Sequence, residues 1–324
     1  LDEIPDSTIA SFLTALTFRG VNHDELRIIR DIMLGHSIQI TPKVNGALID
    51  NCGTGGDMAN SFNISTAASL VASASGINVA KHGNRSSSGM FGSADFFEYI
   101  GFDLNMPEKR AIESLERLGY TFLFAPKFHP KLKRISDIRK GLGFRTIFNI
   151  IGPLCNPCTN ITAQVIGISD PNFFELVSNA MINSTIKKIF LIHSLDGMDE
   201  LSNTSRNIMF IVKSGKVEKH EVDPELLDLK IVRKDQVQIK SAEDSVKTTL
   251  QTIYGKSTPA KQDIVALNAA IALIAGEKTT DINDGIKIAR ELVKSEVPKN
   301  RLRELISSYG NIQKLDLIEK KFSL

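Results

Sequence analysis

The chain has 324 residues, of which 42% are hydrophobic and 23% are charged, values typical of a globular protein with a full hydrophobic core. Its 39 Lys and Arg residues against 37 Asp and Glu give a net charge of +2, so any anion must be bound by a local site rather than by a general nucleic-acid surface. Three cysteines are too few for a disulfide framework, and no apolar run approaches the roughly 20 residues of a membrane span. No segment resembles a signal peptide, and we expect a cytoplasmic protein without nucleic-acid or membrane partners.

The N-terminal segment is predicted to form two short helices. Apolar residues recur with helical spacing over residues 7–18 and again over residues 22–34. The second helix has Asn22 as its N-cap and Gly35 as its stop. The first helix presents one apolar face made of Ile9, Phe12, Leu13 and Leu16, and the second presents Leu26, Ile29, Ile32 and Met33. Short helices need packing partners, either later helices or a second subunit.

The rest of the chain alternates helices and strands. Residues 107–141 are predicted to be helical, with Pro107 at the start and Leu115, Leu118 and Phe122 as apolar positions. Strands are predicted over residues 77–80, 163–169, 189–193, 206–212 and 216–222, and helices over residues 66–75, 173–183 and 259–275. This alternation predicts an α/β sheet with helices packed on its faces.

A glycine-rich segment, Gly53–Asp57, has the composition of an anion-binding loop. Its three glycines within four positions let backbone N–H groups converge on an anion, because no side chain separates backbone from ligand. A helix predicted to begin near Ser65 would add free N–H groups and the positive end of its dipole. Asp57 would repel a bare diphosphate, but it fits beside ribose hydroxyls or a magnesium ion. Taken alone, the segment is equally compatible with a tight turn capped by Asp57.

Two further runs favour a phosphate site. Lys81–Arg85 (KHGNR) follows a short apolar strand and combines two cations with hydrogen-bonding side chains, at a strand end where ligand contacts are common. Ser86–Gly89 adds small hydroxyl donors, and Gly92–Asp95 precedes another helix. A solvated basic loop would not account for the interleaved glycines and serines.

An acidic pair, Asp199 and Glu200, follows the strand predicted over residues 189–193. Magnesium prefers a few carboxylates together with water and substrate phosphate oxygens, so this pair is a candidate metal site. By itself the pair also fits an acidic surface turn. The rival doublet Glu243–Asp244 is interpreted as the capping turn of a helix that begins after Ser241.

Taken together, these runs resemble the anthranilate phosphoribosyltransferase family, a group of class III phosphoribosyltransferases. The motifs GTGGD, NIST, KHGNR, GSAD, RTIFNIIGPLCNP, the Asp199–Glu200 pair and LNAA occur in that family's order and cover essentially the whole chain. The resemblance implies transfer of the phosphoribosyl group from phosphoribosyl diphosphate to the amine of anthranilate, with release of diphosphate, in tryptophan biosynthesis.

The resemblance also implies a fold and an assembly. It predicts a small all-helical domain, residues 1–43 together with about 107–147, and a large α/β domain, residues 44–106 together with 148–324. The large domain has a central, mostly parallel sheet flanked by helices. A homodimer through the helical domain is expected.

Ligand contacts follow from the same resemblance. Phosphoribosyl diphosphate would be bound by Gly53, Thr54, Gly55, Gly56, Asp57, Ser61, Asn63, Ile64, Ser65, Thr66, Lys81, His82, Gly83, Asn84, Arg85, Ser86, Ser87, Ser88, Gly89 and Ser93. Anthranilate would be bound by Gly53, Asn84 and Arg139, with His82, His129 and Pro153 lining its approach. Two magnesium ions per subunit are expected, with Ser65, Asp199 and Glu200 as ligands.

The expected chemistry requires little acid–base catalysis. Arg139 would pair with the anthranilate carboxylate through its planar fork of donors. An aromatic amine is neutral at pH 7, so no general base is needed and none is assigned. Cys155 and Cys158 have the spacing of a redox or zinc pair, but one pair supplies only two ligands, which favours a structural role.

Two other functions are compatible with parts of the pattern. Pyrimidine nucleoside phosphorylases share the class III architecture, but they carry a longer glycine- and histidine-rich run where this chain has HGNRSSSG. A non-catalytic relative that binds nucleic acid through basic surfaces is the second alternative. The intact ligand set and the net charge of +2 argue against it.

Overall fold

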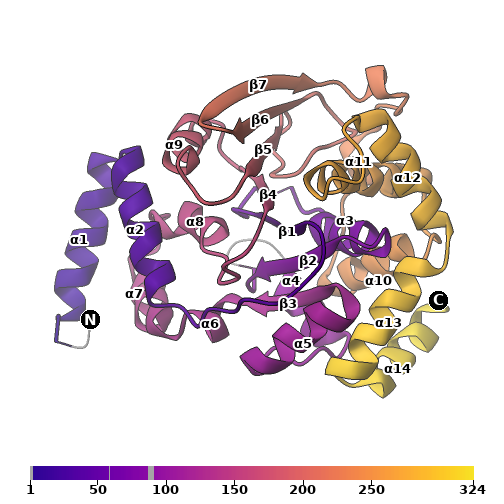
Figure 1. Cartoon of the computed structure of the whole chain (residues 1–324), viewed down its shortest axis with the longest axis horizontal. Coiled ribbons are helices and arrows are strands. Elements are labelled where there is room, and N and C mark those ends of the chain that lie inside the picture. Colours follow the sequence, from indigo (N-terminus) through magenta and orange to yellow (C-terminus); the bar gives the residue numbers. More distant parts are fainter. Residues whose placement is uncertain (1–2, 58, 87–90) are drawn as a thin grey trace.

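A seven-stranded sheet forms the centre of the molecule (Figure 1). The computed structural model describes residues 3–57, 59–86 and 91–324. The strand order is β3-β2-β1-β4-β5-β6-β7. The strands are β1 (Leu48–Gly53), β2 (Asn78–Gly83), β3 (Tyr120–Phe124), β4 (Ala163–Gly167), β5 (Lys188–Ser194), β6 (Asn207–Lys213) and β7 (Lys216–Val222). The first five strands of this order, from β3 through β1 to β5, pair in parallel, and β6 and β7 pair antiparallel. This arrangement confirms the predicted mostly parallel sheet.

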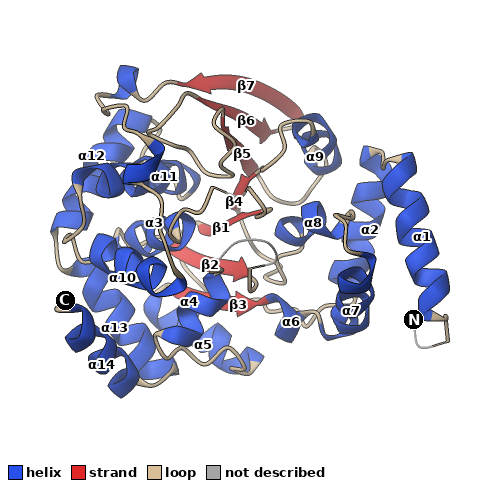
Figure 2. Ribbon diagram, turned by 180° about the vertical axis from the view of Figure 1, so that it is seen from behind, coloured by secondary structure: helices blue, strands red, loops and turns tan. Residues whose placement is uncertain are grey.

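Helices cover both faces of the sheet, as Figures 1 and 2 show from opposite sides. They are α1 (Asp6–Arg19), α2 (His23–Gly35), α3 (Ile64–Ala74), α4 (Ser93–Tyr99), α5 (Glu108–Leu118), α6 (Ala125–Phe128), α7 (Lys133–Leu142), α8 (Phe148–Ile151), α9 (Phe173–Met181), α10 (Ala242–Ile253), α11 (Pro259–Ala275), α12 (Ile282–Lys294), α13 (Val297–Tyr309) and α14 (Ile312–Phe322). The main core packs α3 and α11 against the sheet, and a second core joins α2, α8 and α9 to β4 and β5.

The strand order reverses direction next to β1. From β1 the chain first adds β2 and β3 on one side and later adds β4 and β5 on the other. In open α/β sheets, such a reversal leaves a crevice at the carboxyl ends of the two central strands, where ligands bind. Here those ends are Gly53 of β1 and Gly167 of β4, which are partners in the parallel register.

Several local predictions are confirmed. Asn22 caps α2, because its Oδ1 accepts from the backbone N–H of Glu25 at 2.9 Å while its own N–H donates to Glu25 Oε2 at 3.1 Å. The strands predicted over residues 206–212 and 216–222 form the hairpin of β6 and β7, which turns at Ser214 and Gly215, whose φ angles of 51° and 73° suit the type I′ turn that matches strand twist. The helix predicted after Ser241 is α10, and Ser241 accepts from the N–H of Asp244.

The prediction that residues 107–141 are helical is wrong over residues 120–124, which form a strand. Gly119 ends α5 with a φ of 66°, and residues 120–124 then form β3, which pairs with β2. The run Tyr-Thr-Phe-Leu-Phe has high β-propensity and lies buried in the sheet, so tertiary packing outweighs the helical spacing of its neighbours. Phe122 therefore belongs to the sheet. The division into two domains remains a prediction.

The N-terminal helices leave part of their apolar face uncovered. Ile9, Leu13 and Leu16 are buried as predicted, but Phe12 is 61% exposed and Ile32 on α2 is 57% exposed. The two helices lie at one end of the molecule, away from the sheet (Figure 1). Helix α1 packs mainly against α7 and α2 mainly against α9, and the predicted faces are covered only in part.

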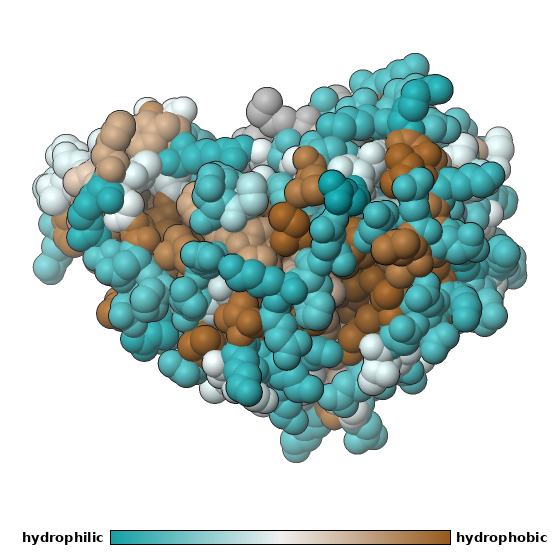
Figure 3. Space-filling view, turned by 90° about the horizontal axis from the view of Figure 1, so that it is seen from above, coloured by the Kyte–Doolittle hydropathy of each residue, from teal (hydrophilic) through white to brown (hydrophobic). Residues whose placement is uncertain are grey.

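Strand β7 forms an exposed edge of the sheet. Its sequence, KVEKHEV, places charged side chains outward, which protects an open strand edge from pairing with other chains. Strand β7 lies at the top of the molecule in Figure 1. Seen from above, the surface is mainly hydrophilic, and hydrophobic residues gather in separate groups (Figure 3). Among the described residues, no helix combines the length and apolar character needed to cross a membrane.

Candidate active site

A cleft of about 300 Å³ lies at the carboxyl ends of the central strands. It brings together residues from positions 51 to 200 of the chain, together with Ile239. The predicted residues that line it are Gly53, Thr54, Gly55, Gly56, Asp57, Ser61, Asn63, Ser65, Lys81, His82, Gly83, Asn84, Arg85, Ser86, Ser93, Arg139, Pro153, Asp199 and Glu200. A mixed polar and apolar cleft at the switch point of a sheet is the usual location of a small-molecule site.

The remaining predicted residues are placed differently. Ile64 and Thr66 lie in the first turn of α3 with buried side chains and do not line the cleft. His129 is buried behind His82, with ring centres 5.4 Å apart, and its Nε2 lies 2.9 Å from the carbonyl oxygen of Cys155. Ser87, Ser88 and Gly89 lie outside the described residues.

The glycine loop adopts a conformation that requires glycine. Gly55 and Gly56 have φ angles of 66° and 77°, in the left-handed region that other residues rarely adopt. Gly53 is needed for a different reason, since a Cβ atom there would lie 2.4 Å from Asp199 Oδ2. The N–H of Gly55 donates to that same oxygen at 2.7 Å. The loop is therefore built around Asp199.

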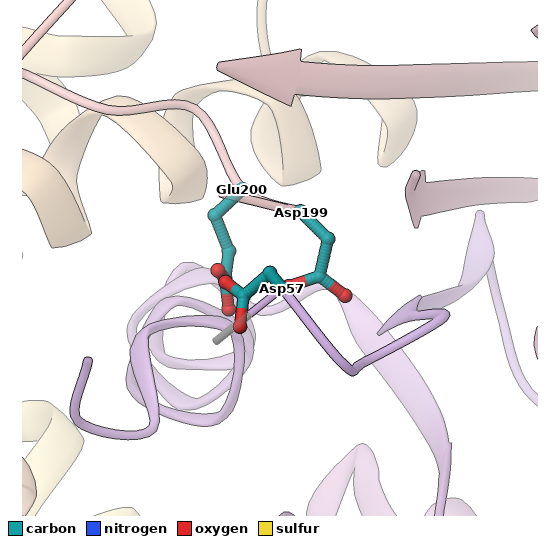
Figure 4. Close-up of side chains that lie close together, drawn as sticks. All are labelled: Asp57, Asp199 and Glu200. Carbon is teal, nitrogen blue, oxygen red and sulfur yellow. The ribbon is translucent and has the colours of Figure 1, made fainter. Parts of the chain in front are cut away.

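Three carboxylates meet on the cleft wall: Asp57 from the glycine loop, and Asp199 and Glu200 from the segment after β5 (Figure 4). One carboxylate oxygen of each lies within 4.8 Å of the others. Burial and the charge of Asp199 raise the pKa of Asp57 to about 7. Burial, together with the negative charges of Asp199 and Asp57, raises the pKa of Glu200 well above its usual value. Asp57 Oδ2 and Glu200 Oε2 are buried without a hydrogen-bond partner.

Such a cluster fits a divalent cation. Hard oxygen ligands with unsatisfied lone pairs and mutual repulsion are what magnesium neutralises. The predicted metal pair thus gains a third carboxylate, Asp57. Ser65, the third predicted ligand, lines the same cleft from the first turn of α3.

Lys81 is a buried cation beneath the cluster. Its Nζ donates to the backbone carbonyl of Asn51 and to Ser65 Oγ, the latter at 3.3 Å. Burial lowers its pKa, and the charges of nearby carboxylates, Glu200 among them, oppose that shift. Lys81 is only 1% exposed, and its hydrogen bonds connect β1, β2 and α3 at the cleft floor.

Arg85, the second predicted phosphate cation, is already paired. Its guanidinium donates to both carboxylate oxygens of Glu98, at 2.7 and 2.8 Å, and to Asp95 Oδ1 at 2.9 Å. The hydrogen bonds to Glu98, and to a smaller extent the one to Asp95, raise the pKa of Arg85. A bidentate pair of this kind fixes the guanidinium plane against α4.

Arg139 projects into the cleft from α7. Its Nη2 donates to Asn149 Oδ1 at 3.0 Å, and its guanidinium lies over the ring of Phe148 at 5.5 Å. Burial lowers its pKa, and its Nε is buried without a partner. No carboxylate among the described residues pairs with it. A half-buried guanidinium without a counter-ion indicates a site for an anionic ligand group.

Sequence reasoning missed several residues that shape the cleft. Asp50 is a buried carboxylate whose Oδ1 accepts from the N–H of His82 at 3.0 Å and whose Oδ2 accepts from Gln164 Nε2 at 3.1 Å. Arg145 donates to the backbone carbonyl of Gly56. Gly167 lies directly beneath Asp199. An acidic residue inside an apolar strand was the only available signal, and it pointed to Asp50.

The burial of Cys155 and Cys158 supports their structural interpretation, and three histidines outside the cleft lie at a strand end or on the surface. Cys155 and Cys158 are buried free thiols whose pKa burial raises to about 12, as expected of structural rather than reactive cysteines. His193 is the penultimate residue of β5, with Nδ1 2.7 Å from the carbonyl oxygen of Ile168. His23 and His220 are exposed.

Comparison with known proteins identifies the class. Residues 45–296 match the family described as "Glycosyl transferase family, a/b domain", in agreement with the α/β fold. The chain is 39% identical over 310 residues to the anthranilate phosphoribosyltransferase of Nitrosopumilus maritimus, covering 96% of this chain and 89% of that protein. It is also 39% identical over 298 residues to that of Acetivibrio thermocellus, covering 92% and 86%. The chain belongs to the anthranilate phosphoribosyltransferase family.

Solved structures agree. The anthranilate phosphoribosyltransferase of Thermus thermophilus superposes with a TM-score of 0.86 at 32% identity, covering 95% of this chain and 91% of that one. The enzyme of Saccharomyces cerevisiae in complex with PRPP and Mg has a TM-score of 0.87 at 24% identity, covering 94% and 85%, which supports the fold.

Proposed function

We propose that this chain transfers the phosphoribosyl group from 5-phosphoribosyl 1-diphosphate (PRPP) to the amine of anthranilate, giving N-(5-phosphoribosyl)anthranilate and diphosphate, in tryptophan biosynthesis. The observation that carries this proposal is the cleft in which an anion-binding glycine loop, a three-carboxylate cluster and an unpaired arginine face one another. Relatives that span almost the whole chain are named for this reaction.

The cleft suits the charges that develop in the reaction. The C1–O bond to diphosphate breaks, the ribose gains positive character, and the amine nitrogen forms the new bond to C1 and releases one proton. Backbone N–H groups of the glycine loop and the hydroxyl of Ser93 would hold the phosphate oxygens. Asp199, Glu200 and Ser65, joined by Asp57, would hold magnesium, which when bound neutralises the leaving diphosphate. We propose that each subunit binds two magnesium ions.

Fluorescence tests the reaction directly. We expect the fluorescence of anthranilate to fall when PRPP and magnesium are added to the protein, and diphosphate to appear in equal amount. Phosphorolysis of uridine or thymidine without PRPP-dependent consumption of anthranilate would instead support the nucleoside phosphorylase alternative. Salt-sensitive DNA binding without turnover would support the nucleic-acid alternative.

Arg139 is proposed to bind the anthranilate carboxylate. Replacing it by alanine removes the charge-assisted pair, so we expect kcat/KM for anthranilate to fall by about tenfold to a hundredfold, with the KM for PRPP within about twofold. Lys140→Ala is the matched control, because Lys140 is the next residue of α7 and its charge pairs with Asp137 at the surface. Unchanged anthranilate saturation in Arg139→Ala would refute the assignment.

Magnesium binding is expected to weaken at low pH. Because the pKa of Asp57 is raised to about 7, this carboxyl is protonated at pH 6 and must lose its proton before a cation binds. The same raised pKa means that the metal-free protein loses stability as pH rises from about 4 through 7. We expect the MgCl₂ concentration that half-saturates the rise in melting temperature to be about tenfold higher at pH 6 than at pH 8. Equal values at both pH values would contradict this protonation state.

We also propose a cytoplasmic homodimer that associates through the helical end of the chain. Phe12, Phe18, Ile28 and Ile32 are more than half exposed on α1 and α2, and Phe18 reaches 83%. Exposed apolar side chains on two successive helices are typical of a subunit interface. The proposed small domain contains these helices, with Arg139 on the side that faces the sheet. Light scattering measures the assembly, and a monomer at micromolar concentration would contradict it.

A further inference from the structure

We infer that Asp95 is a positioning residue for PRPP: it joins the two ends of the segment between β2 and α4 and so fixes one wall of the cleft. This inference rests on the proposed function. Asp95 lies in the first turn of α4 and does not itself line the cleft. Its role is inferred from what its carboxylate holds.

One carboxylate oxygen of Asp95 accepts two backbone hydrogen bonds from residues six positions apart. Asp95 Oδ2 accepts from the N–H of Ser86 at 3.1 Å and from the N–H of Gly92 at 2.9 Å. Its other oxygen accepts from Arg85 Nη1 at 2.9 Å. The same side chain thus fixes the point where the chain leaves the KHGNR run and the point where it enters α4.

The two ends are held in close contact. A Cβ atom on Gly92 would lie 2.4 Å from the backbone nitrogen of Ser86, so only glycine allows this approach. The carbonyl of Asn84 accepts from the N–H of Ala94 at 3.2 Å and completes the junction. Asn84, Arg85, Ser86, Gly92 and Ser93 all line the cleft.

The arrangement explains why this wall needs an acid beside a proposed phosphate site. The two N–H groups and the Arg85 guanidinium neutralise the carboxylate of Asp95, and Glu98 pairs with the rest of Arg85. Asp95 therefore stabilises the wall while the donors around it offset its own charge. Without it, the backbone ends would lose their shared acceptor, and Asn84 and Ser93 would lose their fixed positions.

The test is the kinetics of Asp95→Ala in the full chain. We expect the KM for PRPP to rise by at least about tenfold, while the KM for anthranilate at saturating PRPP stays within about twofold. The matched control is Glu25→Ala. Glu25 occupies the same first-turn position in α2, accepts from its own N-cap N–H and pairs with Arg19, but lies far from the cleft. It should lower the melting temperature to a similar extent and leave the KM for PRPP within twofold.

Glu98→Ala separates the two functions of Asp95. It removes the bidentate pair with Arg85 but leaves both backbone bonds, so we expect the KM for PRPP to change by no more than about threefold. If its effect equalled that of Asp95→Ala, the ion pair rather than the joined ends would carry the effect, and the inference would fail. A KM for PRPP within twofold of wild type in Asp95→Ala would also overturn it.

Asp95→Asn decides the matter if the alanine variant does not fold. It keeps the side-chain volume and one carbonyl acceptor, so we expect a smaller rise in the KM for PRPP, again with little change for anthranilate. An equal rise in the KM for PRPP and the KM for anthranilate would indicate a general structural role and refute the inference. Wild-type protein that consumes no anthranilate would refute the proposed function instead, so the two failures are distinguishable.

Discussion

Gly167→Ala is expected to abolish most of the activity, although residue 167 would make no contact with substrate. A Cβ atom at this position would lie 1.6 Å from the backbone oxygen of Asp199 and 2.7 Å from its backbone carbon. These are backbone atoms, so no side-chain rotation relieves the clash, and the segment that carries Asp199 and Glu200 must move. A displacement of about 1 Å in a catalytic constellation costs roughly a hundredfold in rate, and we expect a loss of at least that size in kcat/KM.

A second consequence separates displacement from unfolding. Asp199 lies over two paired glycines, since a Cβ at Gly53 would also approach its carboxylate. Gly167→Ala should therefore weaken the rise in melting temperature that MgCl₂ produces, while circular dichroism shows the folded spectrum. Gly141→Ala is the control, because a Cβ there meets nothing within 4 Å and the residue lies in α7. A Gly167→Ala variant with normal activity and normal magnesium response would show that the segment can shift without consequence.

Local patterns in the sequence predicted most elements of the fold. Helices such as α2 and α11 carry their own start and stop signals, and the hairpin of β6 and β7 carries the Ser214–Gly215 turn. Strand β3 was missed because five residues between helical segments give little periodicity. Its identity depends on the vacant edge of β2, which is a long-range property.

The candidate site was predicted as a set of residues but not as a geometry. The resemblance to a known family placed the glycine loop and the acidic pair in one site. That resemblance did not include Asp57 among the metal ligands, and it did not indicate that Arg85 is tied to Glu98 or that Lys81 is buried in the cleft floor. Each of these depends on contacts between segments more than ten residues apart. Nothing in the sequence indicates that position 167 needs glycine, because the requirement comes from the backbone of Asp199, which lies against it in the fold.

Glu200→Gln is expected to lower activity by at least about a hundredfold and, at the same time, to stabilise the metal-free protein. The loss follows from removing one charge of the cation site, which would hold the neutralising ion against the leaving diphosphate. The gain follows because burial and the charges of Asp199 and Asp57 disfavour ionised Glu200. At pH 8 without magnesium, we expect the melting temperature to rise by roughly 1–3 °C. A neutral isostere thus relieves repulsion that the functional site retains.

The opposite signs of the two effects make this test specific. A residue needed only for packing would lose stability together with activity, and a surface carboxylate would change neither. Glu243→Gln supplies the second case, because Glu243 lies in the rival acidic doublet and pairs with Lys321 at the surface. Addition of MgCl₂ should stabilise the wild type more than Glu200→Gln, so the difference between their melting temperatures should shrink or reverse as magnesium rises. If Glu200→Gln were less stable than wild type without metal, the repulsion assigned to the three carboxylates would be wrong, whatever its activity.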